Sequence, residues 1–250
     1  EIKGKMLYLH VSKTTTGKHF ASFTCEVPRE NYAKKGKSVG IDVGVKDAAI
    51  LSSGIKYANI HPLKGLEKKL KYENRQLSKK QKGSRSRQRQ RQKVARLHER
   101  IRNLRETRIH FISSDIVNNH DTIIAEDLAV KNMMHNHCLA KALSDVSIGK
   151  LLSQLEYKSN WYGRTFAQVD RFFASSKTCS VCGEKKEDLK LSDRSWTCTT
   201  CHHEHDRDVN AALNILREGL KNLSGLVTKS DIKPQRGEAS SLEESENPDA

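Results

Sequence analysis

The sequence lacks the features by which most membrane, secreted and nucleotide-hydrolysing proteins are recognised. None of its apolar runs approaches the length of a membrane span, and its N-terminal residues carry no signal-peptide pattern. It has no glycine-rich loop that would cradle a phosphate and no Gly-x-Ser-x-Gly elbow. These absences argue against a membrane protein, a P-loop nucleotide hydrolase and an esterase, so we expect a soluble, cytoplasmic protein.

Aromatic residues are scarce, at 6% of the 250 residues, whereas cations are abundant. The chain has 45 Lys and Arg against 30 Asp and Glu, and its formal net charge is +15. A surplus of this size points to a polyanionic partner, most simply nucleic acid. A membrane-surface protein would need an amphipathic or lipidated anchor, and the sequence offers neither.

Most of the positive charge lies in one segment, residues 64–108, where 18 Lys and Arg stand against 4 Glu. Residues 64–119 predict two long helices with a break around Lys82-Gly83-Ser84, and apolar residues predict a seam on the second helix at Leu97, Ile101, Leu104 and Ile109. The simplest alternative to nucleic-acid binding is that these charges form a solvated face of the helices. So many like charges repel one another unless phosphates neutralise them, and this favours nucleic-acid binding. Few aromatics interleave there, which favours contacts with the backbone of a duplex or hybrid over base stacking. The candidates for these contacts are Arg85, Arg87, Arg89 and Arg91.

Alternating strand-like and helix-like segments predict an α/β fold. Residues 5–12 and 19–27 predict a hairpin, and three short strands at 37–44, 47–51 and 55–58 predict an antiparallel meander. Further strands are expected at 121–126 and 164–170, an amphipathic helix with Trp161 on its apolar face at 147–162, and a last helix at 208–219 that ends near Gly219. This order fits a sheet whose faces are covered by helices.

Three carboxylates stand at positions where metal chemistry is plausible. Asp42 lies between two glycines in an apolar strand, and a carboxylate there is costly unless it is paired or binds a cation. Glu126 closes a buried-looking strand, and Asp208 opens the last helix, where Asp206 is the alternative. Each has an ordinary explanation, as a turn cap, a solvated strand end or a helix N-cap. Together, three carboxylates can hold two Mg²⁺ or Mn²⁺ ions about 4 Å apart and so hydrolyse a phosphodiester.

Four of the six cysteines form two tight pairs, and this is a strong metal-site signal. The spacing of Cys179, Cys182, Cys198 and Cys201 places two knuckles opposite each other and predicts a closed, structural zinc site. Gly183 follows the first knuckle, where a positive φ is often needed. Three histidines crowd the second knuckle, and we expect them to be solvated or to face DNA: His202, His203 and His205.

Several motifs together resemble one known family, the transposon-encoded TnpB proteins. The motifs are Gly40-Ile-Asp-Val-Gly44, Ile124-Ala-Glu-Asp-Leu128, Ser175-Ser-Lys-Thr-Cys-Ser-Val-Cys-Gly183, the second cysteine pair and Asp206-Arg-Asp-Val-Asn-Ala-Ala-Leu-Asn-Ile215. The resemblance implies an RNase H-like (RuvC) mixed sheet with flanking helices, an inserted zinc ribbon and a long basic helical hairpin. It also implies that Asp42, Glu126 and Asp208 are the RuvC carboxylates and that the four paired cysteines bind zinc.

The resemblance further implies cleavage of a target DNA directed by a guide RNA. The expected domains are a remnant of an N-terminal β domain at 1–36, the nuclease core at 37–174 with the basic insertion at 62–119, the zinc ribbon at 175–205, the last helix at 206–222 and a disordered tail at 223–250. We also expect that an N-terminal portion is missing. A non-cleaving nucleic-acid-binding regulator and a transposase-type DNA-binding protein remain alternatives, and the sequence does not indicate the oligomeric state.

Overall fold

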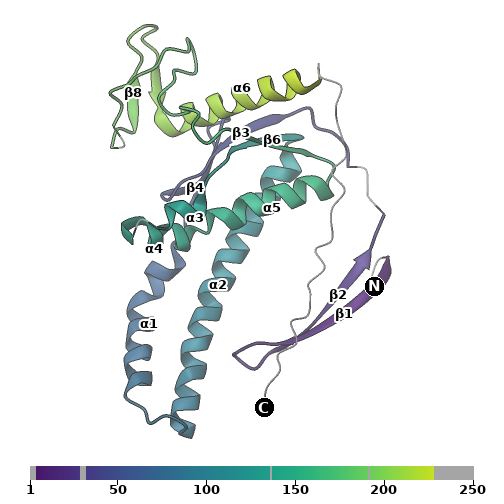
Figure 1. The fold of residues 1–250 in the computed structure, drawn as a ribbon, viewed down its shortest axis with the longest axis vertical. Helices are drawn as coiled ribbons and strands as arrows, with labels where there is room; N and C mark the ends of the chain where they lie inside the picture. The colour runs from purple at the N-terminus through teal and green to yellow at the C-terminus, as the bar shows by residue number, and fades with distance from the viewer. Residues whose placement is uncertain (1–3, 29–31, 136, 191, 228–250) are drawn as a thin grey trace, which may run out of the picture.

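A five-stranded mixed sheet of order β5-β4-β3-β6-β7 forms the centre of the computed structural model, which describes residues 4–28, 32–135, 137–190 and 192–227 (Figure 1). Its strands are β3 (Ser38–Asp42), β4 (Asp47–Leu51), β5 (Lys56–Ala58), β6 (Thr122–Glu126) and β7 (Thr165–Val169). Strands β3, β4 and β5 form an antiparallel meander, whereas β6 runs parallel to both β3 and β7. The predicted α/β class and the predicted meander are therefore confirmed.

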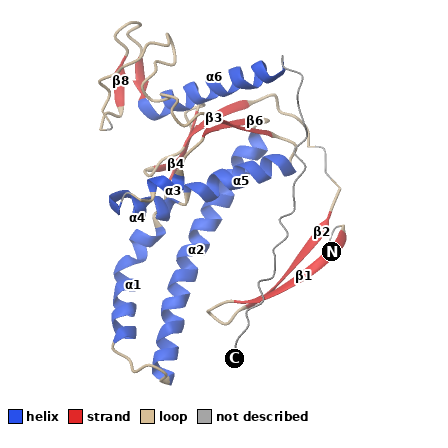
Figure 2. Ribbon diagram, in the orientation of Figure 1, coloured by secondary structure: helices blue, strands red, loops and turns tan. Residues whose placement is uncertain are grey.

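Helices cover both faces of this sheet (Figure 2). The helices are α1 (Pro62–Ser78), α2 (Arg85–Asn119), α3 (Val130–Met133), α4 (His137–Val146), α5 (Ile148–Trp161) and α6 (Arg207–Val227). Of these, α2 and α5 pack on one face of the sheet and α6 packs on the other. Within the part of the chain that the structure describes, none of these helices is long and apolar enough to cross a membrane. Two small sheets lie outside the central one: β1 (Lys5–Lys13) with β2 (His19–Glu26), and β8 (Ser195–Thr197) with β9 (Glu204–Asp206).

The alternation of side chains along β3 and β6 assigns each face of the sheet to different helices. Val39, Ile41 and Ile123 are at most 1% exposed and pack against buried residues of α2 and α5. Gly40 and Ile124 point to the other face, where α6 lies (Figure 1). A Cβ atom on Gly40 would lie 2.1 Å from the carbonyl oxygen of Ala212, so only glycine lets α6 approach this closely.

The basic helices α1 and α2 form an antiparallel hairpin that projects from the core (Figure 1). Its base is fixed by Asp145 of α4, which accepts hydrogen bonds from the backbone N–H groups of Leu63 (3.0 Å) and Lys64 (3.3 Å) and from Arg105 of α2 (2.8 Å). Asp145 is only 5% exposed, so this ion pair is shielded from water. The carboxylate therefore caps α1 from a neighbouring helix and ties the hairpin to the core.

Several expectations about the helices are wrong. Helix α6 continues past Gly219 to Val227, because Gly219 packs directly on Ile124 and serves close helix–sheet contact instead of ending the helix. The rest of the predicted tail lies outside the described residues. Leu104 and Trp161, expected in apolar seams, are 40% and 65% exposed. Helices α3 and α4 were not predicted at all.

Candidate active site and zinc site

Two of the candidate carboxylates end neighbouring parallel strands on the same face of the sheet. In the β3–β6 register Gly40 is opposite Ile124 and Ile41 is opposite Ala125, so the next pair is Asp42 with Glu126. Partners in a parallel pair are about 4.8 Å apart and point to one face. Because Gly40 and Ile124 face α6, the side chains two residues further along also point to the α6 side. We call this cluster, together with Asp208, the carboxylate face.

The electrostatics of Asp42 connect all three carboxylates. The pKa of Asp42 is raised to about 7, first by burial and then by the negative charges of Glu126 and Asp208, whereas the charge of Arg207 lowers it. Burial also raises the pKa of Glu126, against a hydrogen bond from Ser175 that lowers it. A buried carboxyl group whose ionised form is disfavoured by two neighbouring carboxylates is a place where a cation is stabilised.

The two acids at the start of α6 have different surroundings. Asp206 is the helix N-cap: its Oδ1 accepts the backbone N–H groups of Asp208 and Val209, each at 3.1 Å, and its Oδ2 pairs with Lys56 at 2.6 Å. Asp208 lies in the first turn and pairs with Arg207 at 3.1 Å. The ordinary N-cap role considered for Asp208 therefore belongs to Asp206, while Asp208 is the residue whose charge acts on Asp42.

Sequence reasoning missed a set of polar residues that supports Glu126. The Ser175 hydroxyl donates a hydrogen bond to Oε1 of Glu126. Asn214 of α6 holds the same loop, donating to the carbonyl oxygens of Ser175 (2.8 Å) and Thr178 (2.6 Å).

One turn earlier on α6, Asn210 is 1% exposed, and its side chain donates to Thr178 (2.8 Å) and accepts from the backbone N–H of Ser180 (2.9 Å). The signal in the sequence was the spacing of Asn210 and Asn214, which lie four residues apart in the otherwise apolar stretch 209–216. Buried amides at that spacing require partners, and the loop before the first cysteine supplies them.

The four paired cysteines form the one cluster among the described residues in which three or more metal-ligating atoms all lie within 4.8 Å of one another. Sγ of Cys179 is 3.6 Å from that of Cys201, and Sγ of Cys182 is 3.6 Å from that of Cys198. Four thiolates at such distances suit a tetrahedral zinc ion with Zn–S bonds of about 2.3 Å. The cysteine cluster therefore has the ligand type and the spacing that fit a zinc ion.

The two cysteine pairs are folded as matching turns. In the first, the N–H of Gly183 bonds the carbonyl of Cys179 at 2.9 Å and Gly183 has φ +83°, as its position predicted. In the second, the N–H of His202 bonds the carbonyl of Cys198 at 3.0 Å, and His202 adopts φ +57°. The backbone N–H of Cys201 points at the Cys198 sulfur and lowers the pKa of its thiol, which favours the thiolate that metals bind.

One of the three histidines near the second pair departs from expectation. His205 is 4% exposed, its Nε2 lies 3.1 Å from Sγ of Cys179, and its ring packs on Trp196. It therefore belongs to the small core beneath the cysteines and is neither solvated nor available to DNA. His202 and His203 are exposed, as expected.

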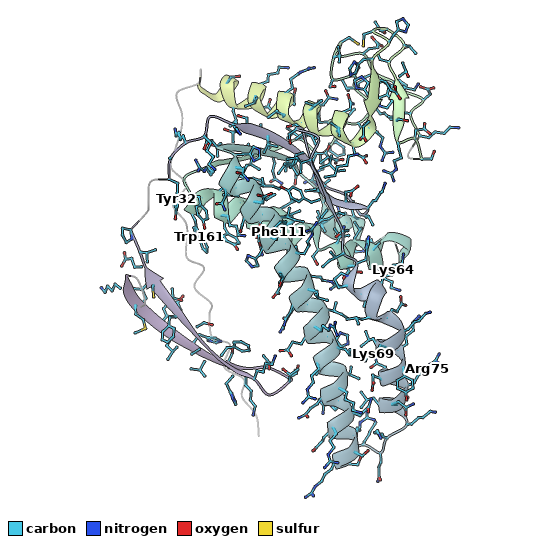
Figure 3. All side chains as sticks on the ribbon, turned by 180° about the vertical axis from the view of Figure 1, so that it is seen from behind. Tyr32, Lys64, Lys69, Arg75, Phe111 and Trp161 are labelled. Carbon is cyan, nitrogen blue, oxygen red and sulfur yellow. The ribbon has the colours of Figure 1, made fainter. Side chains whose placement is uncertain are left out.

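The four candidate arginines of α2 do not share one role. Three are exposed: Arg85, Arg89 and Arg91. Arg87 instead donates to the carbonyl oxygens of Leu77 (2.8 Å) and Lys80 (3.0 Å), so its guanidinium closes the C-terminal end of α1. The cationic surface continues on α1 through the exposed side chains labelled in Figure 3: Lys64, Lys69 and Arg75.

Comparisons with known proteins identify the family to which the chain is similar. Residues 22–137 match the family model OrfB_IS605, described as "Probable transposase", and residues 149–215 match the model of the Cas12f1-like TNB domain. A protein of Streptomyces pristinaespiralis named "Putative RNA-guided DNA endonuclease" is 40% identical over 90% of this chain and 55% of its own length.

Two further matches lie at lower identity. A TnpB-like protein of Acanthamoeba polyphaga mimivirus is 28% identical over 78% of this chain and 39% of its own length. Among solved structures, Cas12f1 in complex with sgRNA and target DNA superposes with a TM-score of 0.53 over 84% of this chain and 55% of that one, at 22% identity. That likeness concerns the fold alone, and the chain spans about half the length of the curated relatives that it matches.

The mixed α/β fold and the family matches define a transposon-associated protein of the OrfB_IS605 class. Within that class, the chain belongs to the TnpB family.

Proposed function

We propose that this chain is the RuvC-type, RNase H-like nuclease core of an RNA-guided DNA endonuclease, and that it hydrolyses phosphodiester bonds at the carboxylate face. The observation that carries the proposal is that the charges of Glu126 and Asp208 act on Asp42. Together with burial, these charges raise the pKa of Asp42 to about 7. The names of the relatives support the RNA-guided activity. The chain spans about half the length of those relatives. We propose that guide RNA and target DNA are its partners, as the names of the relatives indicate for those proteins.

The donor set of the carboxylate face fits hard divalent cations. Carboxylate oxygens suit Mg²⁺ or Mn²⁺, and partly buried acids that repel one another are stabilised when cations replace their protons. The cysteines are the one cluster among the described residues whose ligand atoms all lie within 4.8 Å of one another, so the three carboxylates do not crowd around a single ion. We propose that they bind a pair of ions. Two such ions would supply an activated water and stabilise the leaving oxygen.

The protein's own side chains have distinct tasks in this scheme. Asp42, Glu126 and Asp208 would hold the cations that polarise the scissile phosphate. Ser175 orients Glu126 by its hydrogen bond. Arg207 contacts Asp208 and lowers the pKa of Asp42, so it opposes the protonation of Asp42 that burial favours.

We assign the four-cysteine site a structural zinc ion and the basic hairpin a role in nucleic-acid binding. A closed four-thiolate site leaves no position for a reacting group. The exposed Arg85, Arg89 and Arg91 contact phosphates in this proposal, whereas Arg87 acts within the hairpin. The corresponding domains are the core at 37–174 with its insertion at 62–119, the ribbon at 175–205 and the last helix from 206.

Cleavage assays with paired variants test the assignment. The chain, loaded with the RNA transcribed from its transposon end, is incubated with Mg²⁺ and complementary single-stranded DNA. Glu126→Gln should abolish cleavage, whereas Asp127→Asn should not, because Asp127 is exposed and pairs with Arg171 on the surface. Cleavage that survives both Asp42→Ala and Glu126→Gln would refute the carboxylate assignment and leave a non-cleaving nucleic-acid-binding protein as the better description.

A further inference from the structure

The middle of α2 carries an open groove of about 580 Å³, and neither the candidate carboxylates nor the paired cysteines line it. Its apolar lining is Leu104 and Phe111 of α2 and Ile60, which precedes α1; these side chains are 40%, 57% and 46% exposed. Leu104 and Phe111 are seven residues apart, so they lie on one stripe of the helix. Figure 3 places Phe111 on the side of the core that faces the β1–β2 hairpin.

The charges around this Phe111 groove favour a polyanion. Four cations line it, and one anion, Glu99, is already paired with Lys18 of the hairpin at 3.2 Å. The remaining cations all come from α2: Arg96, Arg100 and Arg108. An apolar surface with such a cationic surplus is a poor site for a protein helix of ordinary composition and a good one for a strand that carries phosphates and bases.

Phe111 and Arg108 form a preorganised stacking element. The Arg108 guanidinium carbon lies 5.5 Å from the centre of the Phe111 ring, and Nη2 is anchored on the carbonyl oxygen of Ala58 at 2.8 Å. Nε of Arg108 is buried and has no hydrogen-bond partner among the described residues. An exposed ring held next to an arginine is the element on which unpaired bases stack in single-strand binders.

We propose that the Phe111 groove binds an unpaired segment of RNA, with a base stacked on Phe111 and phosphates on Arg96 and Arg100. Asn103 and Thr107 also line the groove, and both can hydrogen-bond a 2′-hydroxyl, the group that separates RNA from DNA. The choice of RNA over DNA rests in part on the proposed RNA-guided function. The groove thereby extends the nucleic-acid surface from the backbone-binding arginines of the basic hairpin to a site that reads unpaired bases.

Binding assays on the 250-residue chain test the inference. Fluorescence anisotropy compares an unstructured 10-nucleotide RNA, DNA of the same sequence and a 16-base-pair RNA·DNA hybrid. Phe111→Ala should weaken RNA binding about tenfold, equivalent to about 1.4 kcal/mol, while leaving hybrid binding unchanged. Phe111→Trp should retain the affinity. The matched control is Phe172→Ala, because Phe172 is an aromatic residue outside the groove that is 87% exposed.

Salt dependence separates the phosphate contacts from stacking. Arg100→Gln should reduce the slope of log affinity against log salt by about 0.7 for the RNA, whereas Phe111→Ala should leave that slope unchanged. Circular dichroism should show wild-type melting for Phe111→Ala, since the side chain is more than half exposed.

Two results would overturn the inference while sparing the proposed function: equal RNA affinities for Phe111→Ala and Phe172→Ala, or DNA bound as tightly as RNA with the same loss in Phe111→Ala. Failure of the wild-type chain to bind any of the three probes would count against the proposed function itself.

Discussion

Replacing Ser175 with alanine removes one hydrogen bond at the carboxylate face and little else. The hydroxyl donates to Glu126, and the side chain is buried, with the residue 7% exposed. The backbone carbonyl of Ser175, which accepts from Asn214, is retained in the alanine variant. The loop should therefore keep its position while the Glu126 carboxylate loses the group that orients it.

The magnitude follows from the kind of hydrogen bond lost. A hydrogen bond to a charged group contributes about 1.5–3 kcal/mol, which corresponds to roughly a 10- to 150-fold change in an equilibrium constant. Removing a group that orients a metal ligand costs about 10- to 100-fold in metal affinity or activity. We therefore expect Ser175→Ala to bind Mn²⁺ about 10- to 100-fold more weakly than the wild type.

Electron paramagnetic resonance of free Mn²⁺ measures this affinity without requiring the chain to cleave DNA. Ser176→Ala is the matched control, because the neighbouring hydroxyl is half-buried and makes no hydrogen bond among the described residues. Where cleavage is measured, the activity of Ser175→Ala should recover at high Mn²⁺. If Ser175→Ala and Ser176→Ala both bind Mn²⁺ within twofold of the wild type, Ser175 does not position Glu126 and the reasoning fails.

Three further changes test the fold that supports the site. Gly40→Ala places a Cβ atom 2.1 Å from the Ala212 carbonyl and should cost about 1–3 kcal/mol in urea unfolding, or more if α6 cannot shift. Asp145→Ala leaves Arg105 and the first turn of α1 without their shared partner and should cost about 3 kcal/mol in the same assay. Burial lowers the pKa of Lys158, which is 6% exposed, so the unfolded chain holds that proton more tightly than the folded chain. Stability should therefore rise with pH from the lowered pKa up to 10.5, and Lys158→Met should flatten that rise in thermal melts between pH 8 and 10.5.

The elements that the sequence predicts well are those whose pattern is local. Alternation around Asp42 and the two glycines beside it predicted a buried strand with the acid on the opposite face, and the register with β6 places Glu126 beside it. The two cysteine pairs predicted their own cluster, because the spacing within each pair determines the turn. Both patterns depend on backbone geometry over a few consecutive residues. Residues that are distant along the chain do not change that geometry.

Exposure could not be predicted where a distant element decides it. Leu104 has the spacing of a core residue, yet no helix or strand covers that side of α2 in the part of the chain that the structure describes, and the residue lines a groove. His205 looked like a surface residue of a polar turn, but Trp196 and Cys179 enclose it. Gly219 resembled a helix end until the sheet below it was known. The contacts that decide exposure come from other elements of the fold, from Trp196 nine residues before His205 to Ile124, which lies 95 residues before Gly219.

Through helix α6, the cysteine-containing segment helps to hold the carboxylate face in place. Asn214 bonds both Ser175, whose hydroxyl holds Glu126, and Thr178, which directly precedes the first cysteine. Three residues separate Ser175 from Cys179, and this loop is fixed at both ends, by the Glu126 carboxylate on one side and by the cysteine cluster on the other. A short loop held at both ends has few alternative conformations. The cysteine cluster therefore limits how far Ser175 can move, which gives a mechanical reason for the position of the cysteine-containing segment between β7 and α6.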